Sequence, residues 1–154
     1  MGRVNPPGIS YLYTALDEQT AIAEMRMGRE CVLSLAPVSL ICDVRLVDLS
    51  NVKPLRSPLG RETLKADLDD RWLLMRFAEE LSKPVRPEDG PLEYVPTQYL
   101  AETVLDLGYD GLLYKSGFAK GENLVLFDKA IAQVDDVRLV VVEDINVEWN
   151  DYLP

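Results

Sequence analysis

Histidine is absent from this 154-residue chain, and cysteine occurs only twice, at Cys31 and Cys42. Without histidine there is no Ser-His-Asp or Cys-His relay, no imidazole general base and no histidine metal ligand. Two separated cysteines do not form a structural zinc site either, so we expect no metal. The chemistry that remains is that of carboxylates, hydroxyls, guanidinium groups and aromatic rings. That set suits cleavage of a glycosidic or N-glycosidic bond, where a carboxylate stabilises an oxocarbenium-like transition state.

Positive charge is also scarce, because 16 lysines and arginines stand against 26 aspartates and glutamates and give a formal net charge of −10. Nucleic-acid binding needs clustered cations that neutralise phosphates, so we expect no direct contact with nucleic acid. An anionic small molecule would need local cations that oppose the overall negative field. Arg3 is the first candidate for such a cation.

Long apolar runs are missing as well. No stretch reaches the roughly 18–20 apolar residues of a membrane helix, and the N-terminus lacks the basic-then-apolar layout of a signal peptide. Both cysteines lie in apolar segments, ECVLSL and SLICDV, which predicts buried, reduced thiols rather than a disulfide. We therefore expect a cytoplasmic protein without a membrane segment.

The hydrophobic patterns predict a single α+β domain over residues 1–154, with a strand-rich core and about three helices. Strands are expected at residues 9–16, at 31–50 as two strands interrupted near Pro37, and at 109–116, 123–128 and 137–149. Helices are expected at residues 17–28, 61–83 and 95–108.

The ends and faces of these helices follow from individual residues. Asp17 is expected to cap the first helix and Thr97 the third, while Gly28 and Gly108 end them. In the second helix the apolar residues predict one buried side, which comprises Leu64, Leu68, Trp72, Leu73 and the run from Met75 through Leu81.

The segment GRVNPPGISYLYTALDEQTAIAE, residues 2–24, concentrates groups suited to a nucleotide. Arg3, followed by Asn5 and a rigid proline turn, offers a guanidinium fork that matches phosphate. Tyr13 is a candidate for stacking on a base and orienting a ribose, and Tyr11, expected on the same face, is its rival. Glu24 follows small and apolar residues, which predicts a partly desolvated carboxylate. Each residue also has a plain structural interpretation, as a solvated arginine, a core tyrosine or a solvated helix glutamate.

A second group of candidates lies at the end of the strand GLLYKS. Ser116 stands where this strand gives way to the loop GFAKG, and loops of this kind with free backbone amides often cradle anions. Lys115 and Lys120 flank the serine with positive charge, and Asn123 is a neighbour. The alternative interpretation of Ser116 is an ordinary turn serine.

The segments GRVNPPG…YLYTALDEQTAIAE and YDGLLYKSGFAKGENLVLFD together resemble the RES-domain family. The family pattern has an arginine in Gly-Arg-x-Asn, a tyrosine on the next strand and a glutamate on the following helix. A serine ends a late strand that begins with Asp-Gly. Here those positions are Arg3, Tyr13, Glu24 and Ser116, and the resemblance spans residues 2 to about 128.

The resemblance implies a bacterial toxin of a toxin–antitoxin pair that degrades NAD, with a core similar to the ADP-ribosyltransferase fold. No cofactor is required in this hypothesis, because NAD is the substrate and inorganic phosphate is the co-substrate if the reaction is phosphorolysis. The implied partner is an antitoxin protein with a helix-turn-helix domain, and the oligomeric state stays open. Family members usually carry further sequence before the first motif, whereas only Met1 precedes Gly2 here. We therefore expect either a short N-terminus or a piece of a longer protein.

Three hypotheses of different classes follow. The first is an NAD phosphorylase or NAD glycohydrolase, in which the catalytic residues are Arg3, Tyr13, Glu24 and Ser116. In it, NAD is bound by Arg3, Asn5, Tyr13, Lys115 and Asn123. The second is an ADP-ribosyltransferase that uses the same cleft but modifies a macromolecular acceptor. The third is a non-catalytic interaction module in which these residues are structural.

Overall fold

A computed structural model describes residues 2–53, 64–83 and 91–145 of the chain. These residues form an α+β arrangement of eight strands, three α-helices and two short 3-10 helices, as predicted for the fold class. The strands are β1 (Leu12–Ala15), β2 (Val32–Leu35), β3 (Val38–Leu40), β4 (Leu46–Asp48), β5 (Gly111–Lys115), β6 (Glu122–Leu126), β7 (Ala132–Val134) and β8 (Arg138–Val141). The helices are α1 (Glu18–Glu24), α2 (Leu64–Ser82), α3 (Val95–Asp106), η1 (Pro91–Tyr94) and η2 (Lys129–Ile131).

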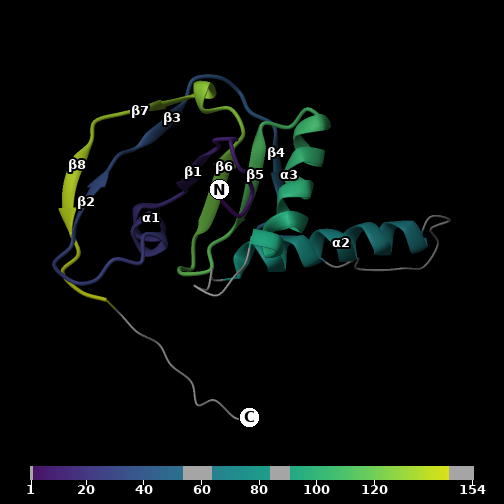
Figure 1. The fold of residues 1–154 in the computed structure, drawn as a ribbon, viewed down its shortest axis with the longest axis horizontal. Coiled ribbons are helices and arrows are strands. Elements are labelled where there is room, and N and C mark those ends of the chain that lie inside the picture. The colour runs from purple at the N-terminus through teal and green to yellow at the C-terminus, as the bar shows by residue number, and fades with distance from the viewer. Residues whose placement is uncertain (1, 54–63, 84–90, 146–154) are drawn as a thin grey trace, which may run out of the picture.

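A four-stranded sheet in the order β1-β6-β5-β4 forms the centre of the fold (Figure 1). β6 pairs antiparallel with both β1 and β5, whereas β4 runs parallel to β5. The central strands β5 and β6 are largely buried, mainly through the apolar stretches GLLY of β5 and LVL of β6, and β6 also buries the polar Asn123. α2 and α3 pack against β5 and close the core around Leu100, Ala101, Leu112 and Val125.

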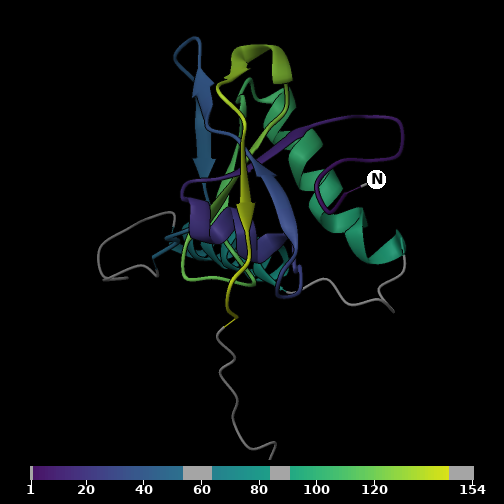
Figure 2. The same ribbon diagram turned by 90° about the vertical axis from the view of Figure 1, so that its left-hand side faces the viewer.

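The remaining strands form two ribbons, β2 with β8 and β3 with β7, both antiparallel. Figures 1 and 2 show these ribbons on the side of the central sheet away from α2 and α3, with α1 between the β2–β8 ribbon and the sheet. The first turn of α1 contacts the ribbon through an ion pair between Glu18 and Arg138. No helix in the described part of the chain is both long enough and apolar enough to span a membrane.

Several local predictions are confirmed. The Asp17 side chain caps α1 by accepting a hydrogen bond from the Thr20 amide at 2.8 Å. The strand region after residue 31 is interrupted at Pro37, between β2 and β3. Gly108 follows α3 with a φ of +79°, a left-handed conformation that glycine adopts without strain.

Other boundaries were predicted wrongly. α1 ends at Glu24 rather than near Gly28, because Met25 is its C-cap and Arg26 turns the chain with a φ of +50°. Residues 31–50 contain three strands rather than two, since a turn at residues 41–45 separates β3 from β4. The last strand ends at Val141, and positions 146–149 of its predicted range lie outside the described residues.

The cap of α3 is also a correction. Tyr94 is the N-cap and makes no capping side-chain hydrogen bond. The Thr97 hydroxyl instead donates to the main-chain carbonyls of Arg3 and Tyr94. The Thr97 side chain therefore makes a tertiary contact to Arg3 and a local contact to Tyr94, but it does not cap the helix amides.

Burial in α2 departs from the prediction at Trp72 and Leu73, and the run from Met75 through Leu81 also includes the exposed Arg76 and Glu79. Trp72 and Leu73 are 64% and 49% exposed. The residues of α2 that pack on the core are Leu74, Phe77, Ala78 and Leu81. These positions follow the i, i+3, i+4, i+7 spacing of one helical face, and Trp72 and Leu73 fall beside it. The side chains of Leu64 and Leu68 lie outside the described residues.

The two cysteines are both free, as expected, but neither is buried. Cys31 is half-buried and Cys42 is exposed. Cys42 lies in the turn between β3 and β4, where a local apolar sequence does not place a side chain in the core.

Candidate functional site

A pocket of about 180 Å³ lies between the N-terminal segment, the central sheet and the C-terminal end of α2. It is lined by nine residues, which are Arg3, Tyr13, Glu24, Leu81, Lys83, Tyr114, Gly117, Phe118 and Asn123. Two cations, one carboxylate and three aromatic rings therefore face one cavity. Such a lining fits a molecule that combines a phosphate with an aromatic ring.

The Glu24 carboxylate is fixed by two side chains of the β5–β6 hairpin. Its Oε1 atom accepts hydrogen bonds from Ser116 Oγ and from Asn123 Nδ2, both at 2.6 Å. Ser116 Oγ in turn accepts hydrogen bonds from the amides of Phe118 and Ala119 at 3.0 Å. Because two amides already donate to the serine oxygen, its own proton points to the carboxylate. Ser116 does not line the cavity and is connected to it through Glu24.

The helix that carries Glu24 is held against the same hairpin at its other end. A Cβ atom at Gly121 would collide with Thr20 Oγ1 and Asp17 Oδ2, so only glycine permits this approach. The Leu16 amide also donates to the Glu122 carbonyl at 3.0 Å. Both ends of α1 are thus tied to one hairpin, which fixes the direction of the glutamate.

Tyr13 and Asn5 form a second fixed unit. The Tyr13 hydroxyl donates to Asn5 Oδ1 at 2.6 Å and accepts from the Val4 amide at 3.2 Å. Asn5 Nδ2 donates to the Ile9 carbonyl at 2.6 Å, which orients the amide. A Cβ atom at Gly2 would lie 2.6 Å from the Tyr13 oxygen, and this crowding explains the glycine before Arg3. Asn5 therefore orients the tyrosine and is not among the residues that line the pocket.

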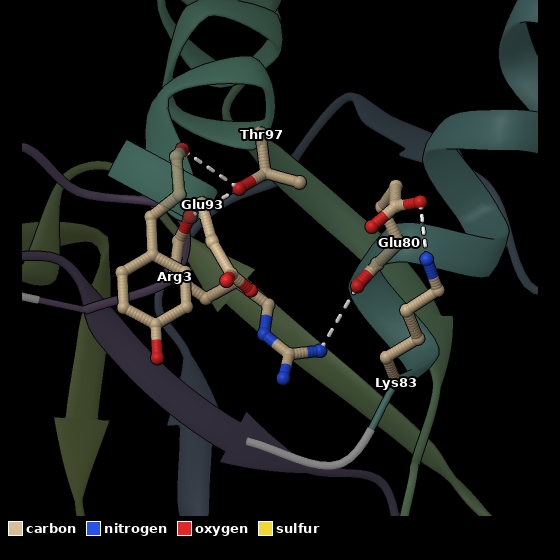
Figure 3. Close-up of a pocket in the computed structure, with 6 residues that line it drawn as sticks. Arg3, Glu80, Lys83, Glu93 and Thr97 are labelled. Atoms are coloured by element: carbon tan, nitrogen blue, oxygen red, sulfur yellow. Dashed lines mark hydrogen bonds and ion pairs between the residues drawn. The ribbon is translucent and has the colours of Figure 1, made fainter. Parts of the chain in front are cut away.

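Arg3 joins the N-terminal segment to the end of α2. Its Nη1 donates to the carbonyls of Glu80 at 3.0 Å and Leu81 at 2.6 Å, which are terminal carbonyls of that helix. Among the described residues, its Nε and Nη2 donate no hydrogen bond and remain free for a ligand. Arg3 and Lys83 also line a smaller adjoining cavity of about 40 Å³. Figure 3 shows Lys83 directed toward the Glu80 carboxylate, with which it forms an ion pair.

The other predicted site residues are placed differently. Tyr11, the rival of Tyr13, is buried in the core and packs on Phe127 with 5.0 Å between ring centroids. Lys115 and Lys120 are exposed and are not among the residues that line the cavity. Within the described residues, no group of three or more His, Cys, Asp or Glu side chains could hold a metal ion.

Five lining residues were not predicted as site residues from the sequence, namely Leu81, Lys83, Tyr114, Gly117 and Phe118. Lys83 ends a long amphipathic pattern, and Tyr114 is a buried position of a strand, so neither has a local feature that marks it. Phe118 lies in the glycine-flanked loop that was expected to cradle an anion, and the Arg26 guanidinium stacks on its ring at 4.9 Å. An aromatic residue inside such a loop is the sequence feature that could have singled out Phe118.

The two pocket tyrosines keep their protons at neutral pH. Burial raises the pKa of Tyr114 far above its ordinary value, and the nearby Tyr13 and Glu24 raise it further. Burial is also the main cause of the raised pKa of Tyr13. Both phenols are therefore hydrogen-bond donors at neutral pH and do not act as phenolate bases.

Tyr114 makes the free energy of unfolding depend on pH in the alkaline range. Its pKa in the folded chain lies above the unfolded value of about 10, so the stabilisation is complete below that pH and is lost as the pH rises beyond it. We expect a slope of up to about 1.4 kcal/mol per pH unit from this group. Urea unfolding at pH values between 8 and 11 measures this slope. In Tyr114→Phe the free energy of unfolding should fall less steeply with rising pH. Tyr99 is exposed, so the control Tyr99→Phe should leave the pH dependence of the free energy of unfolding unchanged. The same pH dependence in the parental chain and in Tyr114→Phe would contradict the role given to Tyr114.

Comparison with known proteins identifies one family. A family model described as RES domain matches residues 1–150, nearly the whole chain. No curated protein and no solved structure was found to match it.

Proposed function

The chain belongs to the RES-domain family, and we propose that it degrades NAD by cleaving the bond between nicotinamide and ribose, through phosphorolysis or hydrolysis. The family is associated with toxin-like, NAD-related activity and with antitoxin partners in general. The observation that carries the proposal is the Glu24 carboxylate, which Ser116 and Asn123 fix in a pocket that also contains Arg3 and Tyr13.

Glu24 supplies the electrostatic part of this mechanism. When the N-glycosidic bond breaks, its electron pair leaves with nicotinamide and positive charge develops at C1′ and the ring oxygen of the ribose. A fixed carboxylate beside these atoms stabilises that charge without having to reorganise. Phosphate or water then forms the new bond at C1′, and a water nucleophile releases its proton. Because both hydrogen bonds to Glu24 engage Oε1, its Oε2 is the oxygen left to face the substrate.

Arg3 supplies the positive charge that the substrate needs. Its Nε and Nη2, which donate no hydrogen bond within the described residues, form a fork for the pyrophosphate of NAD, and Lys83, whose ammonium is paired with Glu80, lines the same pocket. Tyr13 and Phe118 offer aromatic faces to the nicotinamide ring, and the Tyr13 hydroxyl orients the ribose. In this assignment Asn5 acts through Tyr13, Ser116 acts through Glu24, and the exposed Lys115 has no direct contact with NAD.

Product analysis after incubation of the purified chain with NAD tests the proposal. Hydrolysis would release nicotinamide together with ADP-ribose. Phosphorolysis would release nicotinamide together with a phosphorylated ADP-ribose, and only when phosphate is present. Parallel reactions with labelled NAD and cell protein detect transfer to a macromolecule, the outcome that would identify an ADP-ribosyltransferase. Absence of both turnover and binding would leave a non-catalytic module.

The same proposal predicts how the activity is restrained. An enzyme that consumes a central cofactor must be inhibited in its own cell, and we propose a protein antitoxin with a helix-turn-helix domain that covers the pocket. With a net charge of −10, the chain should contact DNA only through that partner. We expect the purified complex to lose nicotinamide release and to bind DNA, while the chain alone binds none. Salt-sensitive DNA binding by the chain alone would contradict this expectation.

A further inference from the structure

We propose that Thr97 and Gln98 of α3 are positioning residues that hold the main chain around Arg3, so that its guanidinium reaches the pocket. This inference rests on the proposed function, because that function assigns Arg3 to the phosphates of NAD. Neither residue lines the 180 Å³ pocket, although Thr97 lines the smaller adjoining cavity beside Arg3. Their effect on the reaction should therefore be exerted through the N-terminal segment.

The contacts are made to three main-chain carbonyls. Thr97 Oγ1 donates to the Arg3 carbonyl at 2.5 Å. Gln98 Nε2 donates to the carbonyls of Gly2 at 3.1 Å and Asn5 at 3.2 Å. Two adjacent side chains of α3 thus bind three of the four main-chain carbonyls of residues 2–5. The sequence separation of 93 to 96 residues makes this a tertiary clamp rather than a local turn.

The N-terminal stretch needs such partners because it forms no helix or strand. Residues 2–10 have no ladder that could satisfy their carbonyls. Thr97 and Gln98 are only 3% and 8% exposed, and the following residues of the same face, Leu100 and Ala101, are apolar core. Polar side chains at such positions remain buried only when they are hydrogen-bonded. Here Gln98 Nε2 donates only to the segment that carries Arg3, and the Thr97 hydroxyl is shared between that segment and the Tyr94 carbonyl.

Two further anchors hold the segment, but neither binds the carbonyls of Gly2 and Arg3. The Arg3 side chain is held at its tip, where Nη1 donates to the Glu80 and Leu81 carbonyls, and Val4 holds the main chain. The Val4 side chain is fully buried and its amide donates to Tyr13, which fixes the segment one residue later. On the other side of Val4, the carbonyls of Gly2 and Arg3 are held by α3. Loss of the α3 donors should therefore free the backbone of Arg3 while Tyr13 stays on β1 and Glu24 stays on α1.

Thr97→Val and Gln98→Met test the clamp, because both keep the size of the side chain and remove the donor. We expect each to raise the KM for NAD by about 3- to 10-fold, the usual range for one hydrogen bond. The kcat should stay within about twofold of the parental value, since Glu24 is not displaced. Thr97→Ser should restore the parental KM. Thr103→Val is the matched control, because the Thr103 hydroxyl donates within its own helix, to the Tyr99 carbonyl.

Combining each variant with Arg3→Ala distinguishes a positioning role of Thr97 and Gln98 from a general loss of stability. In an Arg3→Ala background, Thr97→Val and Gln98→Met should raise KM no further, because the group they position is gone. An unchanged KM in the single variants, or an equal rise in both backgrounds, would overturn the inference.

A second readout does not depend on turnover. The Nε–H resonance of Arg3 in NMR spectra should be a single sharp signal in the parental chain and broadened or shifted in Thr97→Val and Gln98→Met. If the parental chain released no nicotinamide, the proposed function would fail, and this resonance would still decide the positioning role. An Arg3 resonance identical in parent and variants would refute it.

Discussion

Replacing Glu24 with glutamine should lower the kcat for nicotinamide release by about 10²–10³-fold, the usual cost of removing one preorganised electrostatic contact. The amide keeps the size of the carboxylate but removes the charge that opposes the developing cation on the ribose. That charge contributes most in the transition state, so the KM for NAD should change little.

Steady-state kinetics on the purified variant measure both constants. Glu18→Gln is the matched control, because Glu18 is on the same helix, its side chain is 65% exposed, and its partner is Arg138 rather than a pocket residue. Thermal melts verify that both variants are folded. A Glu24→Gln variant that turned over NAD at the parental rate would refute the mechanism, even if NAD binds in this pocket.

Arg3→Ala should act mainly on binding. Loss of a charge-assisted contact to the pyrophosphate costs about 1.5–3 kcal/mol, which corresponds to a rise in KM of roughly 10- to 150-fold. The effect on kcat should be smaller than that of Glu24→Gln, since the phosphates are bound before and during bond cleavage. KM measurements across NAD concentrations, compared with the parental chain, test this expectation.

The control for Arg3 must account for its structural contact. Its Nη1 binds the Glu80 and Leu81 carbonyls, so Arg3→Ala also removes a cap from the end of α2. Arg3→Lys keeps the charge without the planar fork and should bind NAD with an intermediate KM. Nicotinamide riboside, which has no phosphate, should be used equally well by parent and Arg3→Ala. A similar loss with this substrate would show that the variant damages the fold rather than phosphate binding.

The features of the fold that could be predicted from sequence are those set by neighbours in the chain. Asp17 caps α1 through an amide three residues later, and Pro37 interrupts a strand because it has no N–H to donate. Burial depends on distant packing partners and was predicted less well. Trp72 carries a large apolar side chain yet lies off the face of α2 that meets the sheet, and Cys42 faces solvent in a turn.

In the candidate site, too, some residues could be predicted from the sequence, whereas their contacts depend on the fold. Residue type and family resemblance identified Arg3, Tyr13 and Glu24, all within the first 24 residues. Their contacts come from elsewhere, since Ser116 lies 92 residues after the glutamate to which it donates. Lys83 was missed because only the fold brings the end of α2 beside the N-terminal segment. Hydrogen bonds that span the chain in this way have no local sequence pattern.

The most direct test of the central claim is one time course of nicotinamide released from NAD by the parental chain and by Glu24→Gln under identical conditions. The proposed site predicts many nicotinamide molecules per molecule of parental protein, and a rate about 10²–10³-fold lower for the variant. No release by a folded parental chain, or equal release by the two proteins, would contradict it.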